Sequence, residues 1–172
     1  MLINRVWAMP NHNTFSIKPI KELISSYLTP WGGQWLDPFS RNSPFNFQNV
    51  ITNDLDPAQT SDYHMEALDF LNQFSDSYAD GVLFDPPYSP RQISECYKQV
   101  GRTVHMKDTQ SSFYGDRKKE VARVTKHGGI VICFGWNSGG IGKKLGFELI
   151  EILMVAHGGA HNDTICTVER KC

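Results

Sequence analysis

The chain has 172 residues, of which 40% are hydrophobic and 20% are charged, and its formal net charge at pH 7 is −1. This composition fits one globular domain and excludes a disordered chain or a protein that binds nucleic acid through bulk positive charge. The four cysteines form no CxxC pair, no apolar run reaches the roughly 20 residues of a membrane helix, and the first residues lack the apolar region that is typical of a signal peptide. We therefore expect a single domain over residues 1–172, cytoplasmic, with reduced thiols and no membrane association.

In the first half of the chain, helical patterns alternate with short apolar runs that end in loops rich in Asp, Asn and Pro. The elements expected there are, in order, a helix at Lys18–Leu28, strands at Gln34–Leu36 and Asn49–Thr52, a helix at Ala67–Phe74 and a strand at Gly81–Phe84. Pro30 is expected to end the first helix.

The second half begins with a charged helix, predicted at Asp116–Lys126 and capped by the Lys-His-Gly-Gly segment that ends at Gly129. A strand follows at Gly129–Phe134. The β-rich runs Phe147–Ala156 and Thr164–Arg170 are joined by a Gly-Gly loop, which predicts an antiparallel pair. The fold class is therefore α/β, a doubly wound, mostly parallel sheet with an antiparallel C-terminal hairpin.

Asp85-Pro86-Pro87-Tyr88 follows the third strand directly, so it lies at the edge where open α/β sheets bind ligands. Consecutive prolines give a stiff backbone without N–H groups. An aromatic amine is a poor nucleophile because its lone pair is delocalised into the ring. The Asp85 carboxylate and the Pro86 carbonyl could bind the two amine hydrogens and localise the lone pair, while Tyr88 offers a ring on which a base stacks. A strand that simply ends in a proline-rich turn is the structural alternative.

This tetrapeptide resembles motif IV of the amino-methyltransferases that modify adenine N6 or cytosine N4 in DNA, and the aspartate form is commoner in the adenine enzymes. The resemblance extends over nearly the whole chain: Asn13–Ile20 resembles motif X, Leu36–Ser40 motif I and Thr52–Leu55 motif II. The chain is similar to small stand-alone adenine methylases of phages and mobile elements. The resemblance implies a Rossmann-like class I methyltransferase with S-adenosylmethionine as cofactor.

The resemblance implies a set of cofactor-binding residues in these motifs and after them. They are Phe15, Ile17, Asp37, Pro38, Phe39, Ser40, Asp54, Leu55 and Glu66. A carboxylate after the second strand can bind both ribose hydroxyls of a nucleoside, a role open to Asp54 or Asp56. The alternative is that Asp54 caps a helix. The family often has DPFxGxG in motif I, whereas this chain has DPFSRNS without glycine. The loop would therefore hold the methionine end differently, through Asp37 and Ser40.

Glu66 falls where the family places an acidic residue near the adenine of the cofactor, after a short strand at Ser61–His64; alternatively, it faces solvent. The link from Asn53 to Ser61 is short for a parallel crossover, so we expect a reduced helix there.

Substrate binding is predicted at Ser89, Arg91, Trp136 and Asn137. The stretch Ser89–Lys126 also holds about half of the basic residues of the chain, which are Arg91, Lys98, Arg102, Lys107, Arg117, Lys118, Lys119 and Arg123. Together with interleaved aromatic residues, they could form a basic lid over a nucleic-acid strand. A solvated charged helix is the alternative for Asp116–Lys126.

Three other readings are rejected. The glycine-rich Ser138–Lys144 has its first glycine misplaced for a phosphate loop, and Lys144 replaces the required Ser or Thr. His157 and His161 flank a Gly-Gly turn, where polar side chains that stabilise the turn are expected rather than a metal site. No cysteine follows a proline, which excludes the nucleophile of a C5-cytosine methylase.

The sequence thus predicts an adenine-specific DNA methyltransferase that acts by direct attack of N6 on the methyl group, with the base extruded into the pocket. Adenine in RNA, cytosine N4 and a glutamine side chain remain alternative acceptors, and a catalytically silent binding module is the alternative of another class. DNA is preferred to RNA as the partner. Since no separate target-recognition domain fits, specificity would come from Ser89–Lys126, a homodimer or a partner subunit, or be low. A phage-encoded enzyme would act in the host cytoplasm.

Overall fold

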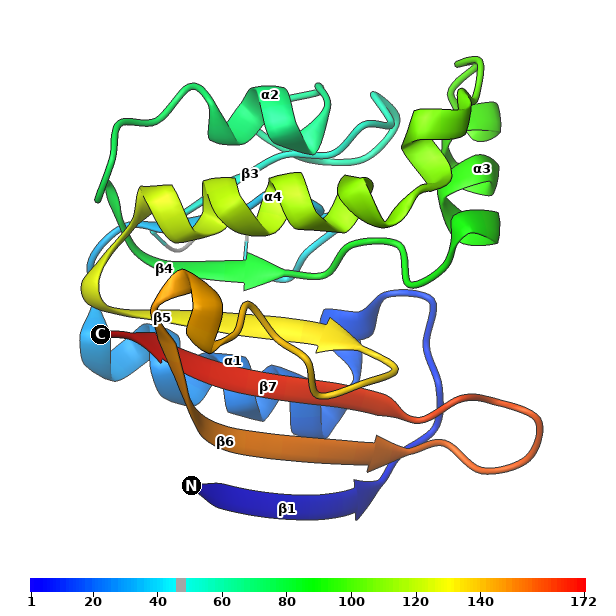
Figure 1. Cartoon of the computed structure of the whole chain (residues 1–172). Helices are drawn as coiled ribbons and strands as arrows, with labels where there is room; N and C mark the ends of the chain where they lie inside the picture. The colour runs from blue at the N-terminus through cyan, green and yellow to red at the C-terminus, as the bar shows by residue number, and fades with distance from the viewer. Residues whose placement is uncertain (46–48) are drawn as a thin grey trace.

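The computed structural model describes residues 1–45 and 49–172, which form one mixed sheet with helices on both faces (Figure 1). The seven strands lie in the order β1-β6-β7-β5-β4-β2-β3, and β7 is the strand that runs antiparallel to its neighbours. They are β1 (Leu2–Trp7), β2 (Trp35–Asp37), β3 (Val50–Thr52), β4 (Ala79–Phe84), β5 (Thr125–Gly135), β6 (Phe147–Ala156) and β7 (Thr164–Lys171). This arrangement confirms the predicted fold class.

The helices divide between the two faces of the sheet. They are α1 (Lys18–Trp31), α2 (Ala67–Leu71), α3 (Pro90–Gln99) and α4 (Ser111–Val124), with short 3₁₀ turns η1 (Thr14–Ser16), η2 (Met106–Thr109) and η3 (Lys143–Leu145). Helix α1 covers one face, while α2 and α4 cover the other (Figure 1). No helix among the described residues is long and apolar enough to cross a membrane.

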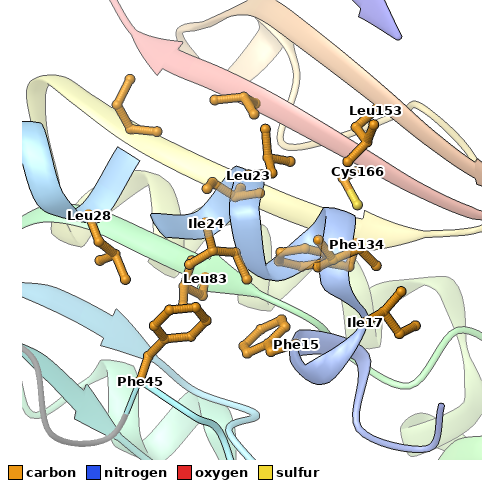
Figure 2. Close-up of a cluster of buried hydrophobic side chains, with 14 of the residues drawn as sticks. Phe15, Ile17, Leu23, Ile24, Leu28, Phe45, Leu83, Phe134, Leu153 and Cys166 are labelled. Atoms are coloured by element: carbon orange, nitrogen blue, oxygen red, sulfur yellow. The ribbon is translucent and has the colours of Figure 1, made fainter. Parts of the chain in front are cut away.

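Side chains alternate between two cores because successive strand residues point to opposite faces. On one face, Leu83 of β4 packs in the same cluster as Ile24 of α1 (Figure 2). On the other, its neighbour Val82 joins the cluster of Val121 from α4. The helices therefore hold β4 rigidly from both sides, and the loop that follows this strand has a fixed base.

Gly81 lets β2 and β4 approach closely at the base of that loop. A Cβ added at Gly81 would lie 2.5 Å from ring carbons of Trp35, a residue that is 1% exposed. Since real atoms do not approach so closely, the indole ring occupies the space that any side chain at Gly81 would need.

Pro30 does not end α1 as expected. The helix continues to Trp31 and ends at Gly32, which has a positive φ of 53° and donates its N–H to the Leu28 carbonyl at 3.2 Å. A proline in the last turn removes one donor, and the backbone conformation that only glycine adopts easily sets the end instead.

The predicted boundary between the fourth helix and the next strand is wrong. Helix α4 begins at Ser111 and ends at Val124, and β5 begins at Thr125, so the Lys-His-Gly-Gly segment lies within the strand rather than capping the helix. Pairing of Ala79 with Thr125 starts the β4–β5 ladder, and the register shifts before Gly81. Tertiary pairing thus overrides the local cap signal. Helix α2 likewise ends at Leu71, three residues before the predicted Phe74.

One strand and one helix were not predicted. Strand β1 pairs in parallel with β6, and all six of its residues are exposed; its apolar residues come in adjacent pairs, so the sequence has no alternation to detect. Helix α3 begins after Ser89, whose hydroxyl accepts the Gln92 N–H at 3.3 Å. The short strand expected at Ser61–His64 is reduced to a single bridge between Asn53 and Tyr63, and the connection before it contains no helix.

Candidate functional site

The carboxyl ends of β2, β3 and β4 open into a pocket of about 1080 Å³. Parallel strands bring the loops that follow them to one edge of the sheet, where open α/β folds bind ligands. The predicted site residues that line this pocket are Phe15, Ile17, Pro38, Phe39, Ser40, Asp54, Leu55, Glu66, Asp85, Pro86, Pro87, Tyr88 and Trp136. Asp37, Ser89, Arg91 and Asn137 are not among the lining residues.

Asp85 carries the carboxyl group at the end of β4. Its Oδ1 accepts a hydrogen bond from the Tyr88 hydroxyl. Loss of solvation raises the pKa of Asp85 from 3.8 to about 6, although hydrogen bonds from Tyr88 and Thr14 and the charge of Arg41 oppose this rise. At neutral pH the carboxyl is therefore largely ionised, and it can still take up a proton within the physiological range.

The two prolines present their carbonyls differently. The Pro87 carbonyl accepts the Tyr114 hydroxyl at 2.7 Å, which ties the loop to α4. No hydrogen bond from a described residue reaches the Pro86 carbonyl. An acceptor therefore remains available beside the Asp85 carboxyl, as amine binding requires.

Tyr88 and Trp136 form an aromatic wall. Their ring centroids are 5.7 Å apart with planes at 71°, an edge-on contact between two loops. Burial raises the pKa of Tyr88 well above its usual value, with the negative charge of Asp85 adding to the effect, so the phenol stays protonated and donates. Trp136 is 42% exposed, which leaves ring surface open to a ligand.

The loop after β2 lies beneath the pocket. Asp37 is fully buried; its Oδ1 accepts the Phe39 N–H at 3.2 Å, and its Oδ2 has no hydrogen-bond partner in the described structure. Burial raises the pKa of Asp37 well above its usual value. Phe39 packs edge-on against Phe84 of β4 at 5.7 Å, so its position is coupled to the Asp85 loop.

Arg41 stands at the position of the first glycine in the family pattern. Its φ of 46° is positive, a conformation that favours glycine, so the loop keeps the glycine backbone without the glycine. The Arg41 N–H donates to Asp54 Oδ2 at 2.8 Å, and its guanidinium donates to the His12 carbonyl at 3.0 Å. Sequence reasoning missed Arg41 as a functional candidate, although its replacement of glycine was the available signal.

Asp54 organises the loops as well as facing the pocket. Its Oδ2 accepts the Arg41 N–H and its Oδ1 accepts the Asp56 N–H, both at 2.8 Å. Burial raises the pKa of Asp54, and these hydrogen bonds act against that rise. The alternative role of Asp54 as a helix cap does not apply, because the residues that follow make turns rather than a helix. Each oxygen keeps capacity for a further donor.

Glu66 lines the pocket but is paired with arginines. Its Oε1 lies 2.7 Å from Arg102 Nη1, and its Oε2 lies 3.0 Å from Arg117 Nη2. Arg117 is 7% exposed and stacks over the Phe113 ring at 3.4 Å. Glu66 thus neutralises a buried cation, a role that the sequence did not reveal because the partners are 36 and 51 residues away.

The described side chains of the 89–126 stretch do not gather into a basic lid over the pocket. Arg91 is exposed and pairs with Glu95 at 2.8 Å. On α4, Lys119 and Arg123 pair with carboxylates on their own helix or nearby, and Arg117 pairs with Glu66. None of these cationic side chains lines the pocket. The alternative, a solvated charged helix, describes α4 better. Ser89 caps α3, and the Asn137 amide oxygen accepts the Gly139 N–H.

The histidine-containing hairpin is structural. His157 is 7% exposed, with Nδ1 at 2.9 Å from the Ala8 carbonyl and Nε2 at 2.8 Å from the Thr164 hydroxyl. It thereby fixes the loop between β6 and β7, which closes one side of the pocket. Within residues 1–45 and 49–172, no group of three His, Cys, Asp or Glu side chains could hold a metal ion.

The residues present fit S-adenosylmethionine. The pocket volume is close to the ~300–1,000 Å³ range of ligand sites. Carboxyl groups outnumber cations along the walls, which suits a ligand with a sulfonium and an ammonium group. Asp54 lines the pocket, and each of its oxygens accepts one hydrogen bond and keeps capacity for another, so it could bind hydroxyl groups of such a ligand.

No family model and no curated protein matches the sequence. Solved structures do match the fold. TrmN from Thermus thermophilus superposes with a TM-score of 0.60 at 16% identity over 91% of this chain and 49% of its own. The N-methyltransferase NodS from Bradyrhizobium japonicum gives a TM-score of 0.60 at 10% identity over 90% and 94% of the two chains.

A third match is the 1,6-didemethyltoxoflavin-N1-methyltransferase of Burkholderia thailandensis, solved with S-adenosylhomocysteine bound, with a TM-score of 0.60 at 12% identity over 90% of this chain and 77% of that one. The chain spans only about half of TrmN and of a further match, PH0851, covering 49% and 45% of their lengths. At these identities the likeness concerns the fold. The chain has the Rossmann-like fold of class I methyltransferases.

Proposed function

We propose that the chain transfers a methyl group from S-adenosylmethionine to the N6 amine of adenine in DNA. The observation that carries the proposal is the convergence of Asp85, Pro86 and Tyr88 with the loops after β2 and β3 in one pocket. A stiff pair of acceptors next to an aromatic ring is the arrangement that binding an aromatic amine needs. The cofactor assignment rests on the fit of this acidic pocket together with the fold.

S-adenosylmethionine, when bound, supplies an electrophilic methyl group on a sulfonium that leaves as a neutral thioether. The Asp85 carboxylate and the Pro86 carbonyl accept the two amine hydrogens and orient the nitrogen lone pair. As the nitrogen–carbon bond forms, positive charge develops on the amine, and the Asp85 carboxylate stabilises it. The extra proton then leaves to Asp85, whose pKa of about 6 allows transient protonation, and passes to water.

A base in this pocket would contact the aromatic wall of Tyr88 and Trp136, whereas its phosphates would lie outside. The pocket walls carry several carboxylates and a single Lys or Arg side chain among the described residues. A polyanionic backbone would be repelled there, so the base would enter alone, extruded from its strand. Specificity for a DNA sequence would then depend on a partner subunit or a second copy of the chain.

The test is transfer of labelled methyl groups to adenine-containing oligonucleotides, with DNA and RNA of the same sequence compared. Asp85→Ala should lower the rate by roughly 100-fold or more, because it removes the acceptor that polarises the amine. Cofactor affinity should stay within about threefold in calorimetry, since the change leaves the β2 and β3 loops intact.

Asp80→Asn is the matched control, because Asp80 lies on the same strand at the opposite end and pairs with Lys126 at 2.8 Å. It should keep its transfer activity. Activity retained by Asp85→Ala, or label found on RNA and not on DNA, would contradict the corresponding part of the proposal.

A further inference from the structure

The charge distribution within the pocket is one-sided. Its walls include five carboxylate residues, which are Asp54, Asp56, Glu66, Asp85 and Glu95. Glu66 and Glu95 are paired with arginines that lie outside the lining. The remaining three carboxylates face a single Lys or Arg side chain among the described lining residues, that of Arg41.

Arg41 forms no ion pair with a described residue. Among the described residues no carboxylate lies within 4.0 Å of its guanidinium, whose hydrogen bond goes to the neutral His12 carbonyl. Its charge nevertheless acts on Asp54, Asp56 and Asp85: it adds to the lowering of the pKa of Asp56 and partly opposes the rise that burial causes in the pKa values of Asp54 and Asp85. The cation therefore lies within electrostatic reach of both ends of the site, with N–H groups left to donate.

The backbone at Arg41 is strained, because its φ of 46° lies in the left-handed region that residues other than glycine rarely adopt. Glycine would relieve this strain and keep the N–H that binds Asp54. A strained residue in a ligand-binding loop points to a function for its side chain.

We propose that Arg41 anchors the carboxylate of the methionine end of the cofactor. This inference rests on the proposed function, since it requires S-adenosylmethionine in the pocket. A guanidinium presents a planar fork that binds a carboxylate through two parallel hydrogen bonds, and no other described side chain in the lining carries a permanent positive charge. The acidic walls attract the ammonium and sulfonium groups, and Arg41 fixes which end of the cofactor carries the anion.

The assignment predicts a selective loss. Arg41→Gln removes the charge and keeps a polar, although shorter, side chain. Arg41→Gly removes the charge and also the backbone strain, so a folding defect would not affect both variants alike. Titration calorimetry would compare S-adenosylmethionine with its decarboxylated analogue, which lacks only the carboxylate. Both variants should bind S-adenosylmethionine about tenfold more weakly, while affinity for the decarboxylated analogue changes less than about twofold.

Arg5→Gln, an exposed strand β1 variant outside the pocket, is the control and should bind both ligands as the wild type does. Equal losses for the two ligands, or no loss for S-adenosylmethionine, would overturn the role of Arg41. Failure of the wild type to bind S-adenosylmethionine would overturn this role and the proposed cofactor together. Selective loss without any methyl transfer to adenine would support Arg41 and contradict the proposed acceptor.

Discussion

Asp85→Asn removes the titratable proton from the carboxyl at the end of β4 and keeps the shape of the side chain. Burial raises the pKa of Asp85 from 3.8 to about 6. A rise of about 2 units corresponds to ~3 kcal/mol between the two protonation states. Asp85 is partly exposed to solvent and the new amide needs partners of its own, so only part of this energy is expected as a gain. We expect the variant to be more stable than the wild type at pH 8, with a free energy of unfolding that is higher by about 1–2 kcal/mol.

The sign of this effect follows from proton linkage. A carboxyl whose pKa is higher in the folded than in the unfolded state stabilises the fold when it is protonated, and that contribution is lost as the pH rises. For Asp85 the loss falls between about pH 4 and pH 6. Wild type and variant should therefore have similar free energies of unfolding near pH 4. Above about pH 6 the variant should be more stable by the full difference.

Urea unfolding at both ends of this pH range measures the difference. Asp80→Asn serves as the opposite control. Desolvation acts to raise the pKa of Asp80, but the hydrogen bonds from Lys126 and Gln34 and the charge of Lys126 together outweigh it, so the pKa is lowered. That variant should lose stability at neutral pH and recover relative to the wild type in acid. The reasoning about Asp85 is refuted if Asp85→Asn destabilises the protein at pH 8, or if its effect is the same at both pH values.

Three further substitutions test the site and its supports. Tyr88→Phe removes a hydrogen bond that lowers the pKa of Asp85, so the acid limb of the kcat/KM profile should move to higher pH; an unmoved limb would contradict the contact. Glu66→Gln leaves the buried Arg117 without its carboxylate and should cost ~2–4 kcal/mol in urea unfolding, whereas a loss below about 1 would show that the pair is dispensable. Gly81→Ala places a methyl group against the indole ring of Trp35 and should lower the free energy of unfolding by ~1–3 kcal/mol. An unchanged thermal unfolding temperature would argue against the tight contact between β2 and β4.

The parts of the fold that sequence reasoning predicted are those with a local signal. Buried strands such as Gly81–Phe84 end in recognisable polar loops, so the mostly parallel sheet and the edge that carries the pocket could be expected. The antiparallel C-terminal pair was visible in two β-rich runs around a Gly-Gly loop. Strand β1 was missed because its residues are exposed on both faces, and only pairing with β6 makes it a strand.

Within the site, the sequence predicted which loops form the pocket but not which residues their side chains contact. The sequence predicted Arg91 as a phosphate ligand, and the structure adds that it forms an exposed ion pair with Glu95 one helical turn away. Glu66 was predicted as a cofactor ligand, and the structure adds that two distant arginines pair with it. At Arg41 the sequence shows only that a glycine of the family pattern is replaced. The positive φ of Arg41 and its lack of an ion pair with a described residue are seen in the folded loops. Ion pairs between segments that are distant in the chain have no local signal in a single sequence, so they could not be predicted.

Nucleoside mass spectrometry of DNA from cells that express the chain tests the central claim most directly. Wild-type protein should produce N6-methyladenine above the background of the host, and Asp85→Ala, expressed to the same level, should not. DNA from the wild-type culture without N6-methyladenine, or an equal yield of the modified base from both proteins, would contradict methyl transfer to adenine at the Asp85 pocket.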